Sequence, residues 1–161
     1  DGAFTAAEGA VRDFRQTVED KSKIGQYVFG GFAKNLYAVT KFDSDAERLF
    51  SIVLENDADV EKWFRPAKGQ FQLFYKSGVD YKEYQPDFVA ETAAAIYMCE
   101  PKMRKEVADP AVLAKKEAAE LWCERASSHT ATYVGKPWKY ALIPHDVIAA
   151  NMSLKRLVGA G

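Results

Sequence analysis

The chain has 161 residues, of which 48% are hydrophobic and 13% aromatic. This composition can build a sizeable core, so it excludes the intrinsically disordered class and favours one domain with an appended segment. The net charge of −1 counts against a free-standing DNA-binding domain, because such domains use excess positive charge to neutralise phosphates.

The predicted elements begin with an ambiguous stretch. Residues 6–20 are compatible with a helix, and residues 34–40 with a strand or a helical turn, on either side of a break at Gly30-Gly31. We expect residues 1–41 to be an N-terminal extension that packs on the core and carries no chemistry. The chain begins with Asp1 rather than Met, so we also expect it to be cut from a longer protein.

A helix is predicted over residues 44–57. Ser44 and Glu47 have the spacing of a capping box, and apolar residues then recur along one face, at Ala46, Leu49, Phe50, Val53 and Leu54. Val60, Trp63 and Phe64 follow, and Pro66 closes the segment.

Three short strand-like runs come next, over residues 70–76, 84–91 and 96–102, and the last two are close enough to form a hairpin. Asp109-Pro110 predicts the start of a second helix, which should run to about Ala126. Residues 138–144 indicate a last strand and 149–157 a terminal helix. The order helix, three strands, helix, strand predicts a mixed α/β (α+β) class, with a small mixed sheet flanked by helices.

One set of residues on the expected hairpin suits metal-dependent chemistry. Residues i and i+2 of a strand share a face, so Glu100 and Lys102 should emerge together. Pro101 between them has no N–H, but its carbonyl is free to bind a cation. Asp87 lies on the preceding strand after Pro86, and a hairpin can bring it opposite Glu100. Two carboxylates and a lysine would then converge, as phosphodiester hydrolysis with a divalent metal requires.

Two further residues have alternative interpretations. Glu47 lies at the edge of the buried helix stripe and could face the site, although its capping position explains it equally well; Glu55 falls almost opposite that stripe and should face away from the core. Lys115 falls within the apolar stripe of the second helix, where a charge is costly unless it is paired. It either extends to solvent along its alkyl chain or reaches the carboxylates or a DNA phosphate.

The segments Tyr84-Gln85-Pro86-Asp87-Phe88-Val89 and Tyr97-Met98-Cys99-Glu100-Pro101-Lys102 resemble the signature of the PD-(D/E)xK nuclease superfamily. They are most similar to the C-terminal endonuclease domain of the restriction (Res) subunit of type III restriction enzymes. Further resemblance, in order and spacing, covers about residues 42–157, including residues 47–50, 60–63, 70–75, 115–123 and 138–146.

The resemblance implies a restriction-endonuclease-like core and a nuclease domain over residues 42–161. It implies a Mg²⁺-dependent DNA endonuclease, with Mn²⁺ able to substitute. Asp87, Glu100 and the Pro101 carbonyl would be the metal ligands, and Lys102 would orient the attacking water. Glu47 and Lys115 would be secondary site residues.

The implied partners are double-stranded DNA, an ATP-driven helicase domain of the parent chain and a modification-methylase subunit. No apolar run approaches the ~20 residues of a membrane span, and no signal peptide is visible. We therefore expect a cytoplasmic location and reduced, buried Cys99 and Cys123. The alternatives are a non-catalytic DNA-binding or docking module of the same fold, and a repair or RNA nuclease of the same superfamily.

Overall fold

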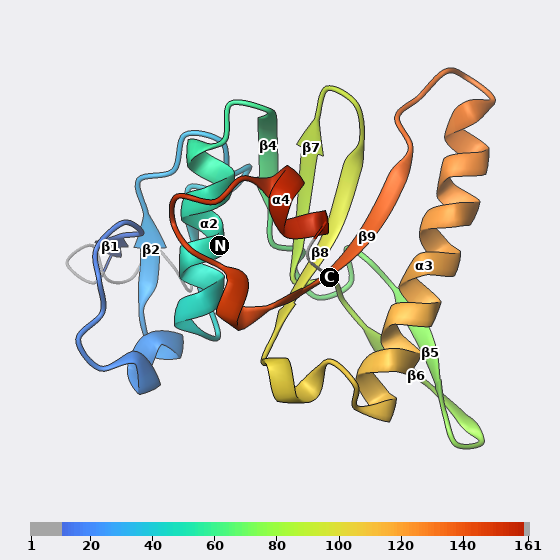
Figure 1. The fold of residues 1–161 in the computed structure, drawn as a ribbon, viewed down its shortest axis with the longest axis horizontal. Coiled ribbons are helices and arrows are strands. Elements are labelled where there is room, and N and C mark those ends of the chain that lie inside the picture. Colours follow the sequence, from blue (N-terminus) through green and yellow to red (C-terminus); the bar gives the residue numbers. More distant parts are fainter. Residues whose placement is uncertain (1–10, 160–161) are drawn as a thin grey trace.

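A computed structural model describes residues 11–159 and shows a mixed α/β chain with three separate sheets. The predicted mixed class is therefore confirmed. The main sheet stands between helix α2 on one side and helix α3 on the other (Figure 1). Within residues 11–159, none of the helices is both long and apolar enough to cross a bilayer.

Helix α2 (Asp45–Asn56) confirms the first predicted helix. Ser44 is its N-cap, and the Ser44 hydroxyl accepts a hydrogen bond from the backbone N–H of Glu47 at 3.2 Å. This bond satisfies one of the four N–H groups that a helix leaves free at its start. The buried face of α2 includes Phe50, Val53 and Leu54, as the apolar spacing predicts.

The main sheet has the order β4-β7-β8-β9. Strands β4 (Val60–Phe64), β7 (Phe88–Thr92) and β8 (Ile96–Lys102) pair antiparallel in succession. The chain then passes through α3 (Pro110–Ala131) and returns as β9 (Trp138–Pro144), parallel to β8. With the β5–β6 strands between β4 and β7 left aside, the chain order of the main sheet and its two helices is α2-β4-β7-β8-α3-β9.

The first strand of this sheet is not the one that the sequence pattern indicated. The predicted strand at residues 70–76 corresponds to β5 (Leu73–Ser77), which pairs only with β6 (Asp80–Tyr84) in a separate hairpin. The strand that joins β7 is instead β4. Val60, Trp63 and Phe64 are spaced by three and one residues, which suits a helical continuation as well as a strand, so the sequence pattern did not distinguish them.

Each face of the sheet has its own core. Phe88, Cys99 and Ile143 face α2 and join a large apolar cluster, whereas Met98 faces α3 and packs with Ala119 and Cys123. The β5–β6 hairpin lies against α3 on this second side through Leu73 and Tyr84 (Figure 1). Alternate residues of β8 therefore point to opposite cores, which places Glu100 and Lys102 on the α3 side with Met98.

Between residue 11 and the start of α2, the described chain contains no long helix. The interpretation of residues 6–20 as a helix is wrong over residues 11–20, because β1 (Val11–Asp13) pairs there with β2 (Val28–Gly30). Strand β2 pairs in turn with β3 (Val39–Thr40). Residues 6–10 lie outside the described chain. A short 3-10 helix, Lys21–Gln26, connects β1 to β2. Phe14, Val18, Ile24 and Phe29 are buried in the same cluster as α2.

The remaining elements are short. Two 3-10 turns, Arg104–Glu106 and His145–Val147, follow β8 and β9. The predicted terminal helix at 149–157 is observed later and shorter, as α4 (Leu154–Gly159). Helix α3 runs five residues beyond its predicted end at Ala126.

Candidate active site

The β7–β8 hairpin carries the two predicted acids: Asp87 directly precedes β7, and Glu100 lies within β8. The hairpin register pairs Phe88 with Cys99. Asp87 lies in a bend, and Glu100 directly follows Cys99 in β8, one residue beyond the last β7–β8 pair. The charge of Glu100 raises the pKa of Asp87, so the two acids lie near each other.

The hairpin turn fixes this register from the other end. The Thr92 hydroxyl accepts hydrogen bonds from the backbone N–H groups of Ala94 at 3.3 Å and Ala95 at 3.1 Å, and it donates to the Ala95 carbonyl at 3.1 Å. A register shift of one residue would turn every side chain of β8 to the wrong face. The Thr92 contacts therefore help to fix which residues of β8 pair with β7.

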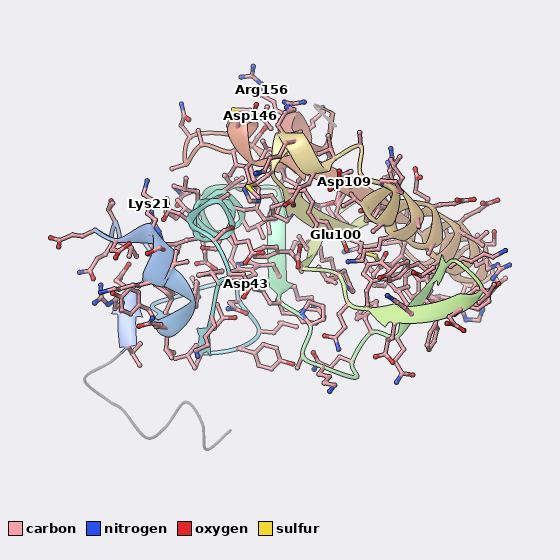
Figure 2. All side chains as sticks on the ribbon, turned by 90° about the horizontal axis from the view of Figure 1, so that it is seen from below. Lys21, Asp43, Glu100, Asp109, Asp146 and Arg156 are labelled. Atoms are coloured by element: carbon pink, nitrogen blue, oxygen red, sulfur yellow. The ribbon has the colours of Figure 1, made fainter. Side chains whose placement is uncertain are left out.

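Glu100 is the most deeply buried acid of the site, with 3% of its surface exposed. Figure 2 shows it inside the molecule, whereas Asp146 and Arg156 lie at the periphery. The Tyr140 hydroxyl on β9 donates a hydrogen bond to Glu100 Oε2 at 2.9 Å. Burial raises the pKa of Glu100, and Tyr140, Lys102 and Lys115 partly oppose that rise.

Asp87 is crowded by negative charge. A quarter of its side chain is exposed. Burial, followed by the carboxylates of Glu47 and Glu100, raises the pKa of Asp87 to about 7, although Arg65 and Lys102 act in the opposite direction. Asp87 would thus be only partly ionised at neutral pH, and a bound cation would favour its charged form.

Pro101 and Lys102 keep their places in the strand. Pairing of β8 with β7 ends at Cys99, while pairing with β9 continues through Pro101 and Lys102. The proline therefore lies where β8 has a strand partner on one side only, the kind of position that tolerates the loss of a backbone donor. Lys102 is half-buried and lies close enough to lower the pKa of both Asp87 and Glu100.

Lys115 of α3 points toward the site rather than only along the surface. Its ammonium lies 5.4 Å from the ring centre of Tyr75 and 5.8 Å from that of Tyr84, within the range of cation–π attraction. The Tyr84 hydroxyl donates to the Lys115 carbonyl at 2.8 Å, which ties α3 to the β5–β6 hairpin. Lys115 also lowers the pKa of Glu100, so a second cation faces the buried carboxylate.

Glu47 is buried, with 5% exposure, and its carboxylate faces inward. Glu47 Oε1 accepts hydrogen bonds from the Asp43 N–H at 2.7 Å and from Arg65 Nη1 at 2.7 Å. The carboxylate thus caps the chain just before the helix and also forms an ion pair.

The expectation that Glu55 faces away from the core is wrong. Glu55 accepts hydrogen bonds from the N–H groups of Ala33 and Lys34 at 2.7 and 2.8 Å, and from Trp63 Nε1 at 2.9 Å. The N-terminal segment covers this side of α2, a contact that a helix-periodicity argument cannot detect. Glu55 therefore fastens residues 33–34 and β4 to α2.

Two residues near the acids did not emerge from the sequence. Arg65 follows β4 and contacts both Glu47 and Asp87, and Tyr140 donates to Glu100. Tyr140 has a weak signal, because a polar hydroxyl at an inward position of a strand needs a buried partner. Arg65 has no sequence signal of this kind, since an arginine that follows a strand is usually a surface residue.

The donor set fits a hard divalent cation better than a softer one. Carboxylate and carbonyl oxygens are the ligands that Mg²⁺ and Mn²⁺ prefer, and the site offers Asp87, Glu100 and the Pro101 carbonyl. Among residues 11–159, no group of three or more His, Cys, Asp or Glu side chains is placed to hold a metal ion. No protein-family model and no curated protein matches the chain.

Proposed function

We propose that this chain is a metal-dependent DNA endonuclease domain of the PD-(D/E)xK kind, with a restriction-endonuclease-like core. The observation that supports the proposal is that Asp87, at the start of the β7–β8 hairpin, is close enough to Glu100 and Lys102 for both to shift its pKa. Asp87 directly precedes β7, Glu100 lies in β8, and Lys102 follows Glu100 on the same face of the strand. Apart from the β5–β6 strands inserted after β4, the succession α2-β4-β7-β8-α3-β9 is compatible with the helix, three strands, helix and strand that the resemblance implies.

The electrostatics of the site support a cation-binding role. The pKa of Asp87 is raised to about 7, and the pKa of Glu100 is also raised. In the absence of a cation, it is therefore unfavourable for both carboxylates to be ionised at once. Perturbed pairs of this kind are frequent at functional sites. A divalent ion bound by the two acids would offset the repulsion, hold a phosphate oxygen and lower the pKa of a water molecule.

Each residue then has a distinct task in phosphodiester hydrolysis. Asp87 and Glu100 hold the cation, with the Pro101 carbonyl as a third ligand. The Lys102 ammonium orients the attacking water and stabilises negative charge that develops on the phosphate. Lys115 on α3 adds positive charge near Glu100, and the Tyr140 hydroxyl fixes the orientation of the Glu100 carboxylate.

In this proposal the domain cuts double-stranded DNA for a type III restriction-like helicase–nuclease. The ATP-driven motor and the methylase subunit would supply translocation and sequence recognition. The low net charge of −1 supports that division of labour, because tight DNA binding by the domain alone would call for more positive charge.

The proposal is tested by cleavage of supercoiled plasmid. The purified chain and its Asp87→Ala and Lys102→Ala variants are incubated with Mg²⁺ or Mn²⁺, with and without EDTA. We expect nicking by the wild type alone, and none in EDTA. Equal nicking by all three chains would show a contaminating nuclease and would refute the assignment.

A further inference from the structure

Arg65 reaches from the end of β4 to the start of β7, where Asp87 lies. Arg65 Nε donates to the main-chain carbonyl of Asp87 at 3.1 Å, and Nη2 lies 3.9 Å from Asp87 Oδ1. Nη1 donates to Glu47 Oε1 and to the Lys41 carbonyl, both at 2.7 Å. One guanidinium thus joins the backbone of β7 to the segment that leads into α2.

The Arg65 side chain is largely buried and its guanidinium is surrounded by partners. Its side chain is only 15% exposed, and the guanidinium lies 5.1 Å from the ring centre of Phe88 and 5.7 Å from that of Phe42. Nη2 also lies 3.5 Å from Asp43 Oδ2, so all three guanidinium nitrogens have partners. With its nitrogens engaged in this way, Arg65 is not placed to bind a substrate phosphate.

We propose that Arg65 is a positioning residue that holds Asp87 in place to share a divalent cation with Glu100, and that Glu47 is the anion that anchors Arg65. The inference rests on the proposed function and extends it, because it gives Glu47 a role behind the metal ligands. An arginine can do this and a lysine cannot, since only the planar guanidinium offers several donors in fixed directions.

Two variants separate positioning from charge. Arg65→Lys keeps the positive charge but loses the contacts with the carbonyls, whereas Arg65→Gln also loses the charge. If Arg65 only compensated negative charge, Arg65→Lys would be neutral and Arg65→Gln would strengthen cation binding. Positioning predicts that both variants weaken it, by about tenfold, as is typical when the support of a metal ligand is lost.

The measurement is titration of the full chain with Mn²⁺ alone by isothermal calorimetry, with thermal unfolding followed in parallel. Asp87→Asn serves as the reference for a lost site. Arg48→Lys is the matched control, because Arg48 is also buried and donates to Asp45 Oδ1 at 2.8 Å and to the Phe14 carbonyl at 3.0 Å, away from Asp87. We expect Arg48→Lys to bind Mn²⁺ like the wild type even where its unfolding temperature falls.

Each other outcome has a definite meaning. If the wild type does not bind Mn²⁺, or Asp87→Asn binds it equally well, the proposed function fails together with the inference. If Asp87→Asn loses binding but Arg65→Lys stays within twofold of the wild type, only the inference fails. It fails also if Arg48→Lys loses as much affinity as Arg65→Lys, or if both Arg65 variants are unfolded, because Arg65 would then support the fold in general.

Discussion

Replacing Asp87 with asparagine should stabilise the metal-free fold at alkaline pH while abolishing cleavage. The pKa of Asp87 is about 7 in the folded chain against an ordinary value of 3.8. Between these values the folded chain keeps a proton that the unfolded chain releases, so stability falls as pH rises from about 4 to 7 and then levels off. The full shift corresponds to about 4 kcal/mol at pH 8. Since a quarter of the side chain is exposed, solvent screening should reduce this to about 2 kcal/mol.

The assay is urea unfolding of the wild type and Asp87→Asn at pH 4.5 and pH 8, in EDTA. The two chains should have similar free energies of unfolding at the lower pH, and the variant should be more stable at the higher one. The difference between the two chains therefore reports the titration of Asp87 together with its coupling to Glu100. A variant that is less stable than the wild type at pH 8, or a difference that does not depend on pH, would refute the crowded-carboxylate account.

Three further substitutions test separate contacts. Tyr140→Phe leaves Glu100 Oε2 without its hydroxyl donor and should cost about 1–3 kcal/mol in urea unfolding. Lys115→Met removes a cation that lowers the pKa of Glu100; the acidic limb of the pH–rate profile for plasmid nicking should therefore move to higher pH, and an unmoved limb would contradict the contact. Glu55→Ala leaves the Trp63 indole and two backbone N–H groups without their acceptor and should lower the free energy of unfolding by about 3 kcal/mol, with cleavage per folded molecule retained.

Local sequence signals predicted the part of the fold on which the candidate site depends. The Ser44 cap and the apolar stripe located α2, and β8 and β9 were predicted with their observed bounds. The site required only that β7 and β8 form a hairpin and that strand residues alternate, both of which follow from short-range pattern. For this reason Asp87, Glu100 and Lys102 could be grouped from sequence.

Long-range contacts decided what could not be predicted. The predicted strand at residues 70–76 is observed as β5. The sequence pattern could not show that β5 packs against α3 outside the main sheet, or that β4 pairs with β7 in its place. Glu55 contacts residues 33–34, on the helix face that periodicity assigns to solvent. Arg65 contacts partners that are at least 18 residues away in the chain. The periodicity of a helix or strand predicts which face of that one element is apolar. It does not predict which other segment covers the opposite face.

The most direct test of the central claim is a crystal of this chain soaked in Mn²⁺, measured for anomalous scattering. The account predicts one anomalous peak about 2.0–2.6 Å from a carboxylate oxygen of Asp87 and from one of Glu100, and no peak there in Asp87→Asn. A wild-type crystal with no peak between these two acids, or with its manganese bound elsewhere, would contradict the account.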